Sequence, residues 1–414
     1  YCEIEIIYSN FKYKTQIFME VEYYLYLEPF TYVDMLNDQV LLYNTLSGAN
    51  QTFCSQEIVD FFTKINMQDN YGKYIEIDTI KKDKEWMRLI KWIRDSFSGD
   101  LLCLKNKYNP YILKPYFKNL DTDDLKEDKS LDLIFYINSH CSFNCHYCKK
   151  YYRQFLFCKS NLGNHELDKE SILIFIHKIS IHRISSISFL GEYLIDFISD
   201  KKISDFINRA DCEIILYFNI MSLMNIDLSM LTNFKFKIAI LVNEYYDINL
   251  LILFDKKISK LNLDYTYHMA IDRELNIPDS IEDKIILHPF YNGDNMLFFK
   301  NNVFTELKDF ENYKLSMREL YNKSIINTFY YGRLMVDSDG LIYTSFNNFA
   351  SIGNISDSNI EYLLNKSFSN NHLWYLLRKN ISICSSCIYQ NICPPISDYE
   401  LFINRFNLCH INPL

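Results

Sequence analysis

The spacing of apolar and polar positions changes several times along the chain. Near the start, alternating or continuous apolar residues predict a strand at 23–27 and a hairpin over 32–43 that turns at Asn37-Asp38. Helical spacing follows, with apolar residues at i, i+3, i+4 and i+7 counted from Ile58 and again from Trp86. We therefore predict an α+β module over residues 1–120.

From 131 to about 290 the pattern alternates between nearly continuous apolar runs and amphipathic stretches. The apolar runs predict six strands buried on both faces, at 131–138, 184–190, 212–220, 234–242, 263–269 and 284–290. Helices are predicted after Asp168, a suitable N-cap, and over 193–210 and 245–260. Repeated strand–helix units predict a parallel sheet that curls toward a barrel, with an active site at the carboxyl ends of the strands.

Two further features set the domain limits. A polar, charged stretch at 119–129 predicts the first boundary, and Asp339-Gly340 between apolar arms predicts a hairpin beyond the barrel. A helical pattern follows at 371–379. We expect an N-terminal module at 1–120, a barrel at 125–325 and a third domain at 326–414.

Composition narrows the class of protein. The 414 residues are 49% hydrophobic and 23% charged, which allows two or three domains with large cores. A formal charge of −9 argues against a nucleic-acid partner, and no run of 18 apolar residues predicts a membrane span. No secretion signal is visible, so we expect a cytoplasmic protein. In a cytoplasmic protein, the 12 cysteines are interpreted as metal ligands in preference to disulfide partners.

Three cysteines, Cys141, Cys145 and Cys148, directly follow the first predicted barrel strand. Thiolates select zinc, copper(I) or iron–sulfur clusters. Three thiolates can hold three irons of a four-iron cluster and leave the fourth iron open, whereas a structural zinc site normally needs four ligands. A zinc knuckle completed by His140 or His146, or three unrelated thiols, are the alternatives.

This Cys-x3-Cys-x2-Cys spacing, with Tyr147 before the last cysteine, resembles the cluster loop of the radical S-adenosylmethionine (SAM) superfamily. The resemblance implies a partial barrel of six βα units and a [4Fe–4S] cluster whose open iron is chelated by SAM. It also implies reductive cleavage of SAM to a 5′-deoxyadenosyl radical, with a one-electron reductant as partner.

The second predicted strand ends in Leu190-Gly191-Glu192-Tyr193. Radical SAM proteins commonly carry Gly-Gly-Glu-Pro here, and its backbone meets the amino group of SAM. Gly191 and Glu192 match that segment, so with Tyr147 they are the expected SAM-binding residues. Leu190 and Tyr193 depart from it, and an ordinary strand-to-helix turn at Gly191 is the alternative.

A second group of cysteines lies near the end of the chain, at Cys384, Cys387, Cys393 and Cys409. Together with the preceding hairpin and Gly353-Asn354 it resembles the SPASM domain of peptide-modifying radical SAM enzymes, which binds auxiliary four-iron clusters. The usual cysteine after the hairpin is missing from the segment around Ser345, so four thiolates remain for one auxiliary [4Fe–4S] cluster. A four-cysteine zinc site is the competing interpretation.

The order of these parts resembles a subgroup of SPASM peptide maturases in which some relatives, called pseudo-radical-SAM proteins, have lost the first cysteines. The N-terminal module resembles winged-helix peptide-recognition elements by layout, and a plain N-terminal extension is its alternative. The implied function is an enzyme that modifies a ribosomally made precursor peptide. A degenerate binding or maturase-partner protein is the first alternative, and a sulfatase-type maturase is the second. The sequence singles out no catalytic acid or base.

Overall fold

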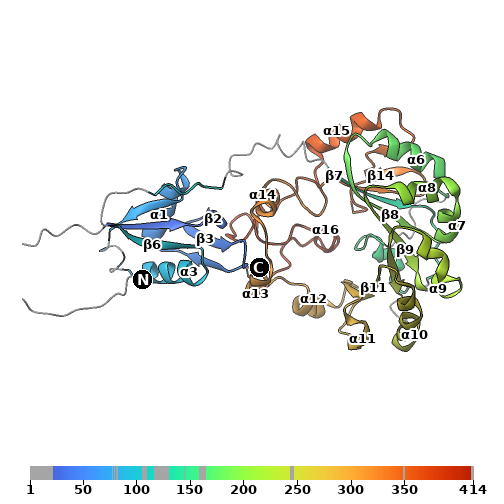
Figure 1. The fold of residues 1–414 in the computed structure, drawn as a ribbon, viewed down its shortest axis with the longest axis horizontal. Coiled ribbons are helices and arrows are strands. Elements are labelled where there is room, and N and C mark those ends of the chain that lie inside the picture. The colour runs from blue at the N-terminus through green and yellow to red at the C-terminus, as the bar shows by residue number, and fades with distance from the viewer. Residues whose placement is uncertain are drawn as a thin grey trace, which may run out of the picture. The chain divides into compact units, whose positions relative to one another are not determined.

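We describe the fold from a computed structural model, which covers residues 22–76, 78, 80, 83–104, 110–115, 130–143, 145–157, 165–242, 247–347 and 350–411. The chain divides into two compact units, Tyr1–Tyr116 and Phe117–Leu414 (Figure 1). The predicted boundary stretch at 119–129 lies outside the described residues.

The first unit holds two three-stranded antiparallel sheets, in the orders β5-β1-β6 and β2-β3-β4. Their strands are β1 (Glu22–Leu27), β2 (Thr31–Leu36), β3 (Gln39–Asn44), β4 (Asn50–Phe53), β5 (Gly72–Ile75) and β6 (Gly99–Leu104). The predicted hairpin is confirmed as β2 and β3. Asn37 and Asp38 in its turn have φ values of 46° and 57°. Tight hairpin turns need positive φ at these positions, and Asn and Asp tolerate this left-handed conformation.

Helices α1 (Gln56–Asn66) and α3 (Lys84–Asp95) confirm the two predicted helical stripes of this unit. Both turn their apolar faces into one core, where the rings of Phe61 and Trp86 meet edge to face at 5.2 Å. The sequence did not reveal β4, β5 and β6, because these short strands carry polar or glycine residues that interrupt the alternating pattern.

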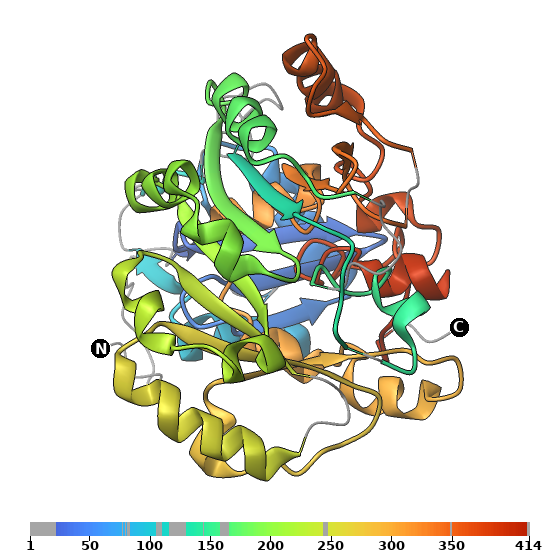
Figure 2. The ribbon, with the colours of Figure 1, turned by 90° about the vertical axis from the view of Figure 1, so that its right-hand side faces the viewer.

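The second unit is built on one nine-stranded sheet, ordered β12-β11-β10-β9-β8-β7-β13-β14-β15 (Figure 2). Its strands are β7 (Ser130–Tyr136), β8 (Arg183–Leu190), β9 (Glu213–Asn219), β10 (Lys237–Val242), β11 (Tyr265–Ile271), β12 (Ile285–Pro289), β13 (Arg333–Val336), β14 (Leu341–Tyr343) and β15 (Gly353–Asn354). All six strands predicted between 131 and 290 are confirmed, and β7 to β12 run parallel. The hairpin predicted at Asp339-Gly340 is formed by β13 and β14. β13 extends the same sheet by pairing with β7 in parallel.

Helices cover the outer face of this sheet and bury its largest apolar core (Figures 1 and 2). The helices of the unit are α5 (Cys148–Tyr151), α6 (Lys169–Lys178), α7 (Leu194–Ser199), α8 (Lys201–Arg209), α9 (Ile220–Met224), η2 (Leu228–Asn233), α10 (Ile248–Ile258), η3 (Ser259–Leu261), α11 (Asp279–Glu282), α12 (Met296–Asn302), α13 (Leu307–Asn312), α14 (Met317–Ile325), α15 (Ile360–Asn370), η4 (Arg378–Asn380) and α16 (Asp398–Ile403). Among the helices in the described ranges, none combines the length and apolar character needed to cross a membrane.

Two helix predictions were wrong in detail. The single helix expected over 193–210 is broken at Asp200, which is extended (φ −63°, ψ 128°) and whose carboxylate accepts bonds from the backbone N–H groups of Lys202 and Ile203. Asp200 therefore caps a new helix, as its side chain favours. The helix expected over 371–379 was placed too late in the sequence. The structure has α15 over the preceding residues, Ile360–Asn370.

The inner face of the sheet carries a pair of histidines on adjacent strands. His268 Nδ1 lies 3.0 Å from His288 Nε2, and His268 Nε2 lies 3.0 Å from Thr266 Oγ1. Aromatic rings surround the pair, with Phe157 at 4.7 Å from His288 and Tyr217 at 5.6 Å from His268 between ring centroids. Burial lowers the pKa of His268 to about 4 and that of His288 to about 3, so both rings are neutral at pH 7.

This pair makes the second unit sensitive to acid. Below the ordinary histidine pKa of 6.5, His268 and His288 bind protons in the unfolded chain but stay neutral in the folded protein. The free energy of unfolding therefore decreases as the pH falls from 6.5 toward about 4. We expect a His268→Gln/His288→Gln double variant to lose less unfolding free energy than the wild type over that range in urea titrations. Replacing the exposed His372 by Gln is the control. An unchanged pH slope in the double variant would contradict this explanation.

Candidate functional site

The three cysteines of the first group lie at the carboxyl end of β7, on a loop that we call the cysteine loop (residues 139–148, with 144 outside the described residues). Cys141 is exposed, whereas Cys145 and Cys148 are half-buried. Cys148 begins the short helix α5, and its N–H donates to the carbonyl of Cys145 at 3.3 Å. The loop therefore places all three thiols at the strand end where the sequence predicted a site.

The carboxylate of Glu192 holds this loop in place. Its Oε1 accepts bonds from the backbone N–H and the hydroxyl of Ser142, at 2.8 and 3.0 Å. Its Oε2 accepts a bond from the hydroxyl of Ser222 at 3.2 Å, and the amide of Asn219 donates to Oε1 at 3.4 Å. Glu192 follows β8, and Asn219 ends β9, so one carboxylate links two strand ends to the cysteine loop.

Asn138 completes the connection from β7. Its buried side chain donates to the Glu192 carbonyl at 2.8 Å and accepts from the Glu192 N–H at 3.1 Å. The same side-chain oxygen accepts from the N–H of His140 at 3.2 Å. These bonds fix the first residues of the cysteine loop against the end of β8.

The segment 190–193 shows why two of its residues depart from the pattern expected of SAM-binding loops. Leu190 is 1% exposed and packs in an inner-face core with Tyr136, so its side chain fills space that a glycine would leave empty. Tyr193 has φ 59°, a value that a proline ring cannot adopt. Gly191 has φ 153°, and a Cβ there would lie 2.4 Å from Ile137 Cγ1, so this position requires glycine.

Tyr147, the third expected SAM-binding residue, packs on aromatic neighbours. Its ring centroid lies 4.9 Å from that of Phe290, just beyond β12, and 4.6 Å from that of His146. The Lys150 ammonium lies 5.8 Å from the same ring centroid. This packing ties the cysteine loop to the far end of the sheet, and contact of Tyr147 with SAM stays a prediction.

Sequence reasoning missed four residues of this hydrogen-bonded site. They are Asn138, Ser142, Asn219 and Ser222. A signal was present for two of them, because Asn138 and Asn219 stand where a long apolar run gives way to a polar side chain. Polar side chains at the carboxyl ends of neighbouring parallel strands meet at one edge of the sheet.

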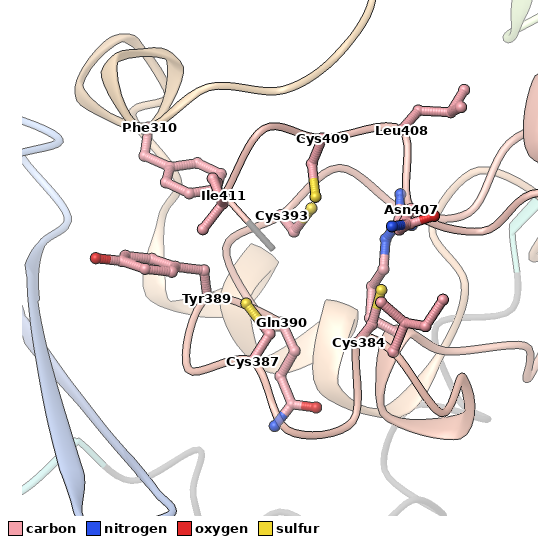
Figure 3. A pocket seen from close by; sticks show the side chains of 12 residues that line it. Phe310, Cys384, Cys387, Tyr389, Gln390, Cys393, Asn407, Leu408, Cys409 and Ile411 are labelled. Atoms are coloured by element: carbon pink, nitrogen blue, oxygen red, sulfur yellow. The ribbon is translucent and has the colours of Figure 1, made fainter. Parts of the chain in front are cut away.

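The four cysteines of the second group line a single small pocket. Figure 3 shows Cys393 and Cys409 on one side of this pocket, with Cys384 and Cys387 across from them. Within the described ranges, no three His, Cys, Asp or Glu side chains converge on a point that could hold one metal ion. This finding applies to both cysteine groups of the chain.

A buried ion pair closes the loop that carries the last two cysteines of this group. Arg378 Nη1 and Nη2 bind the two carboxylate oxygens of Glu400 at 2.5 and 3.0 Å, and the two side chains are only 10% and 2% exposed. The remaining guanidinium donors bind the carbonyls of Pro394, Pro395 and Phe406 at 2.8 to 3.3 Å. The Arg378 side chain therefore binds backbone carbonyls near both ends of the segment between Cys393 and Cys409.

Three thiols of this pocket, those of Cys384, Cys387 and Cys393, are held in their neutral form when no metal is bound. Burial raises the pKa of Cys384 and Cys387, and it raises that of Cys393 to about 12, against the opposing effect of Arg378. A bound metal deprotonates coordinating thiols and would reverse this effect.

Comparisons with known proteins give distant structural likenesses only. No protein-family model and no curated protein sequence matches the chain. The chain is similar to crystal structures of Streptococcus suis SuiB bound to S-adenosylmethionine (13% identity, TM-score 0.38) and bound to precursor peptide SuiA (12%, 0.46), each match covering 94% of this chain and 100% of SuiB. It is also similar to BtrN in complex with AdoMet and 2-DOIA (13%, 0.30), over 61% of this chain and 90% of BtrN. Since these TM-scores lie below 0.5, we argue function from this chain's own residues.

Gly191 offers a direct test of the site's geometry. We expect Gly191→Ala to destabilise the second unit by about 1–3 kcal/mol, because the added Cβ meets Ile137 in a left-handed backbone conformation. Gly293→Ala is the matched control, since it also has positive φ but only the flexible Lys150 ammonium lies within reach, at 3.9 Å. Equal losses of unfolding free energy in the two variants would show that the close approach at Gly191 is unimportant.

Proposed function

We propose that this protein is a radical SAM enzyme that modifies a ribosomally made peptide. The observation that carries the proposal is the cysteine loop itself, with three thiols at the carboxyl end of β7 fixed by Glu192 and Asn138. When bound, a [4Fe–4S] cluster with an open iron site would supply, with SAM, a 5′-deoxyadenosyl radical for hydrogen abstraction. Cys141, Cys145 and Cys148 would hold that cluster.

In this proposal the surrounding residues orient the loop and the SAM molecule. Glu192 and Asn138 keep the loop at the sheet edge, and Gly191 lets the backbone approach the amino-acid part of SAM closely. Tyr147 covers the loop from the side of Phe290. The apolar and aromatic side chains on the inner face of the sheet would shield the bound SAM from solvent.

The second cysteine group would hold one auxiliary [4Fe–4S] cluster. Its support is the single pocket that Cys384, Cys387, Cys393 and Cys409 line, and a zinc ion is the alternative occupant. Ser345, in the segment that would supply a further cysteine, donates a hydrogen bond to buried Asp398 at 3.0 Å. That position is thus part of the polar core, and we propose one auxiliary cluster only.

We further propose that the first unit recognises the precursor peptide. The first unit holds two three-stranded antiparallel sheets. An extended peptide can bind a protein of this kind by adding a strand to a sheet through backbone hydrogen bonds. A one-electron reductant would be the second partner.

A degenerate binding protein is the second candidate function. The observation in its favour is the backbone at Tyr193, whose φ of 59° makes this turn different from one that ends in proline. Such a protein would hold a peptide or a partner maturase without cleaving SAM.

Anaerobic reconstitution with iron and sulfide separates these candidates. We expect about eight irons per chain and dithionite-dependent formation of 5′-deoxyadenosine from SAM. A Cys141→Ala/Cys145→Ala/Cys148→Ala variant should keep about four irons and lose the 5′-deoxyadenosine, because only the auxiliary cluster remains.

The matched control replaces the four cysteines of the second group by Ala. It should also keep about four irons, but these belong to the cluster that binds SAM. Wild-type protein that binds iron but forms no 5′-deoxyadenosine would favour the binding protein. A triple variant that still forms 5′-deoxyadenosine would refute the assignment of the cysteine loop.

A further inference from the structure

Lys323 lies beside the four-cysteine pocket and has no role in the function proposed above. It is on α14, and its ammonium donates to the carbonyls of Ile392 and Cys393 at 3.3 and 3.2 Å. It also lines a small cavity together with Arg378 and Cys393. The positive charge therefore sits directly behind one of the four cysteines.

Among the described residues, this ammonium donates no hydrogen bond to a carboxylate, although Glu319 on the same helix acts on it electrostatically. The hydrogen bonds of its nitrogen go to the two carbonyls only. Glu319, one turn earlier on α14, instead accepts bonds from the N–H and hydroxyl of Ser316, both at 2.7 Å. Glu400 is taken up by Arg378. A partly buried charge that no carboxylate binds directly is stabilised by a further anionic neighbour, and Cys393 lies on the side of its carbonyl contacts.

We propose that Lys323 is the counter-charge of the metal centre held by Cys384, Cys387, Cys393 and Cys409, and that it raises the reduction potential of that centre. The inference rests on the auxiliary iron–sulfur cluster proposed above. Four thiolates outweigh the positive charge of a four-iron core, so the occupied centre is an anion next to this ammonium.

The direction of the effect follows from charge. One-electron reduction adds a negative charge to the cluster, and a fixed cation nearby stabilises the reduced form more than the oxidised form. Arg378 also acts electrostatically on Cys384 and Cys393, and Glu400, which binds it in a bidentate pair, opposes that effect. Lys323 adds a second positive charge beside Cys393, and among the described residues no carboxylate is hydrogen-bonded to it.

The test uses the full chain with Cys141, Cys145 and Cys148 replaced by Ala, so that only the auxiliary centre takes up electrons. We expect Lys323→Met to make the cluster about tenfold less reduced at the potential where the parent is half reduced, followed by electron paramagnetic resonance (EPR) at pH 7. Lys323→Arg should stay within about twofold of the parent, because it keeps the charge.

Lys379→Met is the matched control. It removes the same charge from an exposed lysine whose ammonium bonds the carbonyl of Ser324 at 2.7 Å, and solvent screens that charge. Equal shifts for Lys323→Met and Lys379→Met, or no shift for either, would overturn the proposal. A purely structural Lys323 would lower stability in both Lys323 variants and leave the potential unchanged.

A centre that contains zinc and no iron by metal analysis would also overturn the proposal, because zinc takes up no electron. If Lys323→Met does not retain iron, Lys323→Gln tests the same loss of charge with a polar side chain. SAM cleavage by the wild type is measured separately, so failure of this inference and failure of the proposed function can be told apart.

Discussion

The carboxylate of Glu192 is the interaction on which the candidate site depends. It collects bonds from Ser142, Asn219 and Ser222, and its backbone exchanges two bonds with Asn138. Three parallel strands thereby end in one hydrogen-bonded edge, and the cysteine loop is part of it. These bonds hold the backbone of the cysteine loop around Ser142 against the ends of the neighbouring strands.

The second cysteine group depends on a different interaction, the buried ion pair between Arg378 and Glu400. A short, irregular segment with little apolar core of its own is closed by the buried Arg378–Glu400 pair, whose guanidinium also binds three backbone carbonyls. Removing one partner of such a pair would leave a buried charge unpaired, so both residues are needed together. The pair accounts for how a segment that contains two consecutive prolines still surrounds one pocket.

Elements with a strong period could be predicted from the sequence. Six strands of the parallel sheet, the hairpin at Asn37-Asp38 and the capped helix after Asp168 all follow from local patterns and local chemistry. The helix break at Asp200 and the hydrogen-bond partners of Glu192 could not be predicted. In the sequence, an acidic residue that caps a helix or binds a loop looks the same as one exposed to solvent. What Leu190 and Tyr193 do depends on their neighbours, Tyr136 and the turn at Gly191, which only the fold brings together.

The central claim is that the cysteine loop holds a cluster with an iron open to SAM. The most direct measurement is the EPR spectrum of the dithionite-reduced variant that lacks the four cysteines of the second group, recorded with and without SAM. We predict a reduced [4Fe–4S] signal whose g values change when SAM is added, because SAM becomes a ligand of the open iron. A cluster signal that SAM leaves unchanged, or no cluster signal at all, would contradict the account.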